Sequence, residues 1–359
     1  NQPNVQSQAA GERKLIEDRL AKTAEIRSRG LDPYPARFNR THTSVEAVAL
    51  FQSFEQGDDE SDHQDNHIVR VAGRVMARRG QGKASFIDVR DGHGSIQIFA
   101  RQNTMGDDSY AILDLLDIGD IIGIEGVVIR TRRGEISVEA KNITLLTKAI
   151  RPLPDKWHGL QDQELRFRQR YLDLISNEKA MQNALLRSKV VRSMRDFMHA
   201  RGFIEVETPI LVPVAAGAQA TPFATHHNQL NRDLYLRIAT ELYLKKLIVG
   251  GIERVFEIGR LFRNEGLDHD HNPEFTTIES YQAYADYNDV MCMVEEMIAQ
   301  IAQDTTGSMI LPAISEKRPE INLTPPWPRL DLRSEIIQRT GIDFVETRDI
   351  ESLSKGMKE

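Results

Sequence analysis

The sequence predicts an α+β chain in which a small barrel of short strands precedes an antiparallel sheet with flanking helices. Five strand-like segments separated by turn residues lie within residues 67–150, a spacing typical of small barrels. Farther along, residues 253–265 and 274–284 alternate like two strands around a loop rich in Gly, Asp and His. This pattern predicts an antiparallel hairpin. Helical periodicity occurs on both sides of the strands.

Length and composition indicate a globular protein of two or three domains. Of the 359 residues, 40% are hydrophobic and 28% are charged, which is ordinary for such proteins. The sequence has no run of 18 apolar residues and no recognisable signal peptide, so we expect no membrane span. Its single cysteine suits a reducing cytoplasm. The net charge of −7 argues against non-specific coating of nucleic acid, although a local basic patch could still bind it.

The N-terminal region, residues 1–66, is predicted to be a helix and an extension. The helix covers residues 11–30 and ends at a glycine. Residues 58–67 are acidic and of low complexity, which indicates a surface loop. The apolar side of the helix is expected to carry Leu15, Leu20 and Ile26.

The five predicted strands at 67–150, together with a possible closing helix at 107–116, suggest an OB-fold barrel. OB-folds bind single-stranded nucleic acid by stacking bases on aromatic rings and placing cations near the backbone. Phe86 follows a basic first hairpin here. A basic hairpin is more often a solvated face, so the pattern alone leaves both interpretations open.

Residues 151–180 are interpreted as an interdomain linker, because prolines are followed by a dense charged stretch. Its arginines could pair with neighbouring carboxylates, for example Arg166 with Asp162. The remaining residues, 181–359, begin with a helix that has one apolar stripe. The stripe consists of Leu186, Val190, Met194 and Phe197.

The alternation in the hairpin sorts its side chains onto two faces. Many hairpins simply turn a polar face to solvent. Unpaired buried charge is costly, however, so a face that mixes charged and aromatic residues is a poor core surface and a good ligand surface. The odd-numbered face carries Val255, Glu257, Leu261, Arg263, Phe275, Thr277, Glu279 and Tyr281.

The residue order across this hairpin, FRNEG, then HNPEFTTIE, then YQAYADY, resembles the second signature motif of class II aminoacyl-tRNA synthetases in its bacterial lysyl form. The stretch GKASFIDVRDGHGSIQIF resembles the anticodon-binding OB-fold domain of the lysyl, aspartyl and asparaginyl group. The resemblance implies a cytoplasmic lysine–tRNA ligase with a class II antiparallel sheet at 181–359. Residues 181–209 resemble the first class II motif, which implies a homodimer, although an intrachain core would suit the helix equally well.

For lysine, the resemblance implies a pocket formed by Gly217, Glu241, Glu279 and Tyr281. Two carboxylates that converge on one pocket would repel each other unless a cation lay between them. Either ammonium of lysine supplies that cation, whereas the aspartyl and asparaginyl enzymes must accept an uncharged or negative side chain. A simpler account of Glu241 is a pair with Lys245 one helical turn away.

For ATP, the resemblance implies that Arg263 binds the α-phosphate and stabilises charge during the reaction. Glu265, His271 and Asn272 would hold the adenine and phosphates, and Phe275 would stack on the adenine. No side chain need act as a nucleophile, because the lysine carboxylate attacks ATP directly.

For tRNA(Lys), the resemblance implies that Phe86 stacks on the central uridine of the anticodon. Gln97 and Glu135 would hydrogen-bond the edge of that base, and Arg78 of the basic hairpin is placed in the same site. The linker would lie between the two ends of the bound tRNA.

The third class II motif, GxGxxxGxDR, is absent before Glu359. Ligands for Mg²⁺ are therefore expected beyond that residue. Either the chain is part of a longer synthetase, or it is a shortened paralogue that serves as a non-catalytic tRNA-binding module. The adjacent His226 and His227 lack further ligands at a suitable spacing, so no metal site is expected there.

Overall fold

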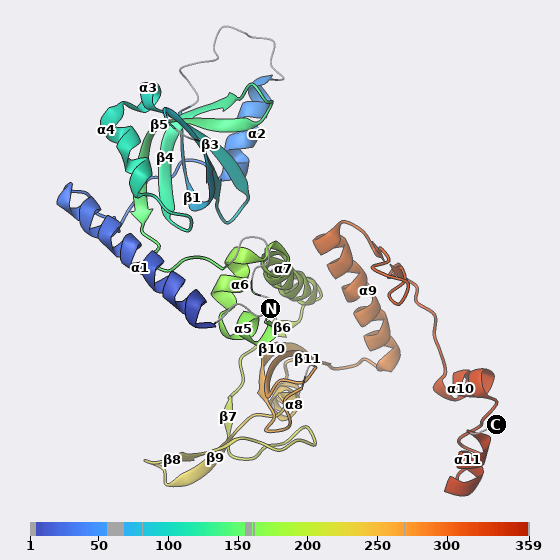
Figure 1. Cartoon of the computed structure of the whole chain (residues 1–359). Coiled ribbons are helices and arrows are strands. Elements are labelled where there is room, and N and C mark those ends of the chain that lie inside the picture. Colours follow the sequence, from blue (N-terminus) through green and yellow to red (C-terminus); the bar gives the residue numbers. More distant parts are fainter. Residues whose placement is uncertain are drawn as a thin grey trace. The chain divides into compact units, whose positions relative to one another are not determined.

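The computed structural model describes residues 5–55, 68–80, 82–154, 160, 162–268 and 270–357, with side chains from residue 10 onward. The chain divides into two compact units, Asn1–Glu178 and Lys179–Glu359, each described by itself (Figure 1). In the ranges given above, no helix is both long and apolar enough to cross a membrane. The acidic loop predicted at 58–67 lies outside the described residues.

A closed barrel dominates the described part of the first unit. Its five strands follow the order β1-β2-β3-β5-β4. β3 and β5 run parallel, and the other neighbours are antiparallel. The five predicted strands are confirmed, whereas the helix predicted at 107–116 is split into α4 and η2. In chain order the elements are α1 (Val5–Ser28), α2 (Ser44–Glu55), β1 (Ile68–Arg79), β2 (Ala84–Arg90), β3 (Ser95–Arg101), α3 (Gln102–Met105), α4 (Asp107–Tyr110), η2 (Ala111–Leu115), β4 (Ile121–Arg130), β5 (Ile136–Thr147), α5 (Gln163–Arg168) and α6 (Arg170–Ser176).

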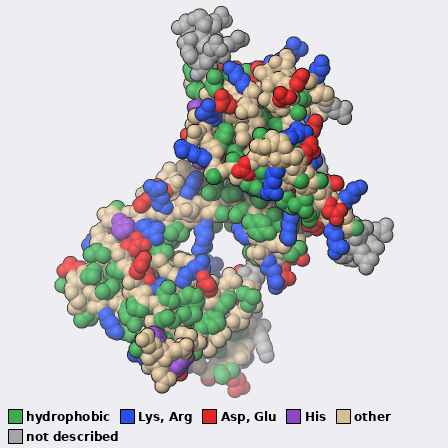
Figure 2. All heavy atoms as spheres, turned by 90° about the vertical axis from the view of Figure 1, so that its left-hand side faces the viewer, with side chains coloured by type: hydrophobic (Ala, Val, Ile, Leu, Met, Phe, Trp, Pro, Cys, Tyr) green, Lys and Arg blue, Asp and Glu red, His purple; other side chains and the backbone are tan. Residues whose placement is uncertain are grey.

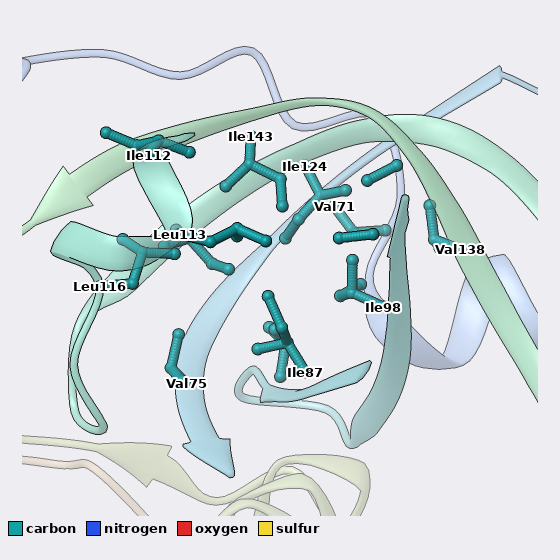
Figure 3. Packing of buried hydrophobic residues seen from close by; sticks show 14 of the residues in the cluster. Val71, Val75, Ile87, Ile98, Ile112, Leu113, Leu116, Ile124, Val138 and Ile143 are labelled. Carbon is teal, nitrogen blue, oxygen red and sulfur yellow. The ribbon is translucent and has the colours of Figure 1, made fainter. Parts of the chain in front are cut away.

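Aliphatic side chains fill the barrel, because alternate residues of each strand point inward. Figure 3 shows these side chains converging on the axis, with Leu113 of η2 among them. Burying each one contributes about 1.5–3 kcal/mol. One fully buried residue from each strand is Val71, Ile87, Ile98, Ile124 and Val138.

Helix α1 is attached to the barrel by polar contacts, which the sequence did not predict. Leu15 and Leu20 are about half exposed, so the predicted apolar side is wrong except at Ile26, which is buried. Arg19 is buried instead. Its guanidinium donates to the carbonyls of Ile118, Ala149 and Arg151.

A second polar contact lies beside Arg19. The Lys148 side chain is fully buried, and its Nζ is 2.7 Å from Asp120 and 2.5 Å from Asp117. Lys22 of α1 binds the same Asp117 at 2.7 Å. Both carboxylates are therefore matched by cations, which is the condition under which buried charge is tolerated.

Residues 151–180 contain α5 and α6, where the sequence predicted a linker. Asp162 caps α5 by accepting from the backbone amides of Glu164 and Leu165. Arg166 therefore pairs not with Asp162, as expected, but with Asp173 at 2.8 Å. Asp173 is buried and binds Arg170 as well. The expected pairing within this segment exists, with a different carboxylate.

Among its described residues, the second unit has small sheets flanked by helices. The strand orders are β11-β10-β6, β7-β9-β8 and β12-β13. The predicted hairpin is confirmed as β10 and β11. In chain order the elements are α7 (Glu178–Ala200), β6 (Ile204–Glu205), β7 (Leu211–Val212), β8 (Ala224–His227), β9 (Arg232–Leu236), α8 (Glu241–Val249), β10 (Arg254–Phe262), β11 (Glu274–Gln282), α9 (Tyr287–Thr306), β12 (Ile310–Leu311), β13 (Ile321–Asn322), α10 (Leu332–Thr340) and α11 (Ile350–Gly356).

The even-numbered face of the hairpin contributes Phe256, Ile258 and Ile278 to a hydrophobic cluster with α7 and α9. Phe256 is fully buried between Phe197 and Met198 of α7 and Met297 and Ile301 of α9. This packing leaves the odd-numbered face for α8, which contacts both strands. The chain is therefore α+β, a barrel followed by an antiparallel-rich sheet with helices, as predicted. Of the predicted stripe on α7, Val190 and Met194 are partly buried against this cluster, whereas Leu186 is exposed.

Charges are mixed on the surface. Figure 2 shows Lys and Arg side chains interspersed with Asp and Glu over the visible face. This distribution agrees with the net charge of −7 and does not favour non-specific binding of a polyanion.

Candidate functional site

The strands β10 and β11 carry most of the candidate residues. They pair antiparallel, with Leu261 opposite Phe275 and Glu257 opposite Glu279. Residues opposite each other in such a pair lie on the same face, so the predicted odd-numbered face is confirmed.

Part of this face is core, which the sequence did not predict. Val255 and Leu261 are buried, and Glu257 is only 4% exposed. The Glu257 carboxylate binds the guanidinium of Arg237 and accepts from the Thr208 hydroxyl at 2.6 Å. Both side chains of the ion pair are 4% exposed. Glu257 is therefore a buried, paired residue and not part of an open ligand surface.

The rest of the Arg237 side chain is also fixed. Its Nε donates to the carbonyl of Arg260 at 2.8 Å, and Nη1 donates to the carbonyl of Thr208 at 3.1 Å. A Cβ at Gly259 would overlap the guanidinium. Glycine at that position of β10 is thus needed to admit Arg237. Arg237 follows β9, and no motif in the sequence marked it.

The residues expected to bind lysine lie together. Gly217 has a φ of +90°, and a Cβ there would lie 2.9 Å from Ala239 and 3.1 Å from the Cβ of Glu241. Any side chain would therefore collide with the start of α8. Glu279 on β11 accepts from the backbone amide of Thr240 at a long 3.4 Å. Gly217, Glu241 and Glu279 thus surround the N-terminus of one helix.

Tyr281 lies within the electrostatic reach of these carboxylates. Burial, followed by the negative charges of Glu279 and Glu241, raises the pKa of Tyr281 to about 12. The hydroxyl is therefore a neutral donor at physiological pH. Lys245 forms an ion pair with Glu241, as the simpler sequence interpretation expected. Its ammonium also lies 5.8 Å from the centroid of the Tyr281 ring.

Arg263 and Phe275, both expected at the nucleotide, are also adjacent. The guanidinium carbon of Arg263 lies 5.2 Å from the centroid of the Phe275 ring, within the range of a cation–π contact. The Arg263 Nε is buried and has no hydrogen-bond partner among the described residues. A buried donor without a partner is rare in folded proteins.

The other residues expected at the nucleotide lie on an exposed loop between the strands. Glu265, His271 and Asn272 are all exposed. His271 binds Asp268 through Nδ1 at 2.8 Å. This bond raises the pKa of His271, and backbone donors together with His271 lower the pKa of Asp268. Of this trio, Glu265 contacts Arg263 through the backbone, because its amide donates to the Arg263 carbonyl at 2.9 Å.

His226 lies beside a carboxylate. Its Nδ1 lies 2.8 Å from Asp233 on the neighbouring strand. Within the described ranges, no group of three His, Cys, Asp or Glu side chains is arranged to hold a metal ion.

On the barrel, two of the residues expected at the anticodon, Phe86 and Gln97, lie on the outer face of β2 and β3. The rings of Phe86 and Phe99 stack with centroids 4.6 Å apart and planes 8° apart. Arg101 lies over Phe99 at 5.1 Å. The sequence reasoning missed Phe99 and Arg101, although the period-two spacing Gln97, Phe99, Arg101 could have revealed them.

Next to the rings lies the polar pair that was expected to read a base edge. Gln97 is buried, and its Nε2 donates to Glu135 at 2.7 Å, while its Oε1 accepts from Ser137 at 3.0 Å. Arg78 is not beside them. By register it shares a face with Ile87 and not with Phe86, and its guanidinium donates to the Leu113 carbonyl.

Two family models match the chain. The model described as tRNA synthetases class II (D, K and N) matches residues 162–354. The model described as OB-fold nucleic acid binding domain matches residues 69–146.

Curated relatives cover both regions. Proteins named lysine–tRNA ligase are 51% identical over 346 residues in Dehalococcoides mccartyi strain 195, and 48% identical over 341 residues in Bacillus cereus. These alignments cover 96% and 95% of this chain, and 68% and 67% of the relatives. With a class II model that matches more than half of its length and relatives at this identity, the chain belongs to the class II tRNA synthetases of the D, K and N group, with an OB-fold anticodon-binding domain ahead of its synthetase domain.

Proposed function

We propose that this protein is a lysine–tRNA ligase, which activates lysine with ATP and transfers it to tRNA(Lys). The observation that carries the proposal is the pair of carboxylates, Glu241 and Glu279, that act together on Tyr281. Curated relatives that carry this name support it.

The lysine pocket is selective because of its charge. An ammonium between Glu241 and Glu279 offsets the repulsion between the two carboxylates. In return, the ammonium exchanges its hydrating water for charged acceptors. The neutral hydroxyl of Tyr281 donates a further hydrogen bond. A substrate with a carboxylate or carboxamide side chain leaves this negative pocket uncompensated. Gly217 lets the backbone approach the amino acid, since a side chain there would meet α8.

Arg263 and Phe275 would bind ATP in the first reaction. The adenine stacks on Phe275, and Arg263 donates its terminal amines to the α-phosphate. A lysine carboxylate oxygen attacks the α-phosphorus, which forms lysyl-adenylate and releases pyrophosphate. Arg263 offsets the charge that accumulates on the phosphoryl oxygens. Glu265, His271 and Asn272 complete this site when their exposed loop folds over the nucleotide.

The second reaction transfers the lysyl group to tRNA. A terminal ribose hydroxyl of the tRNA attacks the activated carbonyl carbon and loses its proton. The bond from that carbon to the bridging oxygen breaks, and AMP leaves with the oxygen. Family membership implies the use of Mg²⁺. The described residues offer no ligand set for it.

The barrel would read the anticodon. A base stacks on the face of Phe86 that is not covered by Phe99, a contact worth about 1–3 kcal/mol. Gln97 keeps one N–H for the base edge and Glu135 keeps free lone pairs, because the bonds seen between them use only part of their capacity. Arg78 contributes positive charge from the rim of the barrel.

The organisation of the chain is part of the proposal. We assign residues 1–66 to an N-terminal extension, 67–150 to the anticodon-binding domain, 151–180 to the linker, and 181–359 to the catalytic domain. We also propose that α7 contributes to a homodimer and that the protein works in the cytoplasm.

Exchange of labelled pyrophosphate into ATP tests the activity. The protein expressed from its complete coding sequence is expected to support exchange only when lysine is added. Exchange that ignores lysine, or its absence, contradicts the proposal. If exchange is absent while tRNA(Lys) still binds through Phe86, the protein is instead a non-catalytic tRNA-binding module.

A further inference from the structure

One carboxylate of the proposed lysine pocket is already paired with an ammonium of the protein. Glu241 and Lys245 lie one turn apart on α8 and form an ion pair. Glu241 is 34% exposed and Lys245 is 56% exposed, so a competing cation can reach the carboxylate from solvent.

A helix-surface pair would not explain the second contact of Lys245. Its ammonium lies 5.8 Å from the ring centroid of Tyr281, which belongs to β11 and not to α8. The side chain therefore leans from the helix toward the strand, across the space that Glu241 shares with Tyr281. The next residue behaves differently, because Lys246 lies 5.0 Å from the ring of Tyr243 on its own helix.

We propose that Lys245 is an affinity-determining residue, an internal cation that occupies the empty pocket and competes with the substrate ammonium for Glu241. This inference rests on the proposed function. In the empty protein, Lys245 offsets part of the repulsion between the carboxylates. Lysine must displace it, and only a ligand that brings its own cation leaves Glu241 paired.

Competition between Lys245 and the substrate predicts a different change in lysine affinity on removal of Lys245 than a structural role does. When Lys245 is replaced by a neutral side chain, lysine binds more tightly, because no internal cation needs to move. Two like charges about 6 Å apart in a water-like medium correspond to a factor of about three in affinity. If Lys245 only stabilised α8 or shaped the pocket, its loss would weaken binding or leave it unchanged.

The test compares Lys245→Met, Lys245→Arg and the matched control Lys246→Met in the full-length protein. Calorimetry gives the Kd for lysine, and pyrophosphate exchange gives the KM values for lysine and ATP. We expect Lys245→Met to lower the Kd and the KM for lysine about threefold without changing the KM for ATP. Lys245→Arg, which keeps the cation, and Lys246→Met should match the wild type.

The outcomes separate this inference from the function on which it rests. If the wild type binds lysine and Lys245→Met binds it equally or more weakly, Lys245 is a surface pair and the inference is wrong. If the wild type does not bind lysine, the proposed function is wrong and the inference falls with it. Should Lys245→Met fail to fold, Lys245→Gln carries the same expected change.

Discussion

The replacement Glu257→Gln is expected to destabilise the second unit by about 3–5 kcal/mol. The change keeps the shape of the side chain and removes its charge. Arg237, whose side chain is 4% exposed, is then left with the backbone carbonyls of Thr208 and Arg260 as its main acceptors. A buried cation without its counter-ion is costly, because it can neither lose its charge nor reach water.

Hydrogen exchange followed by mass spectrometry measures this loss of stability in individual peptides. Peptides from β10 and β11 should exchange about a hundredfold faster or more, since each 1.4 kcal/mol corresponds to a factor of ten. Glu274→Gln is the matched control on the same hairpin. Its pair with Arg260 spans 3.4 Å and is more than half exposed on both sides, so its loss should cost at most about 1 kcal/mol.

Two results would refute this reasoning. One is Glu257→Gln exchanging no faster than Glu274→Gln. The other is a double variant, Arg237→Met with Glu257→Gln, that is less stable than Glu257→Gln alone. Removing both charges leaves no buried cation, so part of the stability should return.

Three further predictions concern the proposed sites. Glu279→Gln should lower kcat/KM for lysine in pyrophosphate exchange about 100-fold, because a charged acceptor is lost; an unchanged value would remove Glu279 from the pocket. Phe86→Ala should weaken tRNA(Lys) binding about tenfold or more in a filter-binding assay, with lysine-dependent exchange in the absence of tRNA as the control. In an ultraviolet titration, the difference between the wild type and Tyr281→Phe should show a pKa of about 12. Because this pKa is raised above that of the unfolded chain, the stability linked to Tyr281 is complete below pH ~10 and is lost as the pH rises toward 12; a difference that titrates near 10 would contradict the assigned surroundings.

The sequence predicted the elements whose pattern is local. The barrel strands were correct because inward residues such as Ile87 and Ile98 alternate with polar ones. The hairpin was correct because the same alternation continues through β10 and β11. The family resemblance then supplied candidates that a pattern cannot, and the structure brings Gly217, Glu241 and Glu279 together.

What the sequence could not show depends on partners that are distant along the chain. Arg19 reads as a surface residue of α1, and its burial depends on carbonyls about a hundred residues or more away. The sequence alone places Glu257 on a predicted ligand surface, because it does not show the ion pair with Arg237, 20 positions earlier. Phe99 was missed because its partner Phe86 lies on the neighbouring strand. In each case the deciding contact is tertiary.

The attachment of α1 to the barrel constrains the order in which the first unit can be completed. Helix α1 is made before the barrel, yet Arg19 binds the carbonyls of Ala149 and Arg151, 130 and 132 residues later. Lys22 needs Asp117, which in turn is held by Lys148. During synthesis α1 therefore cannot form these contacts until the last strand of the barrel has been made and the barrel has closed. Contacts of such long range form late, because the chain between them must be ordered first. The polar contacts of α1 are thus secured only after the barrel to which they bind.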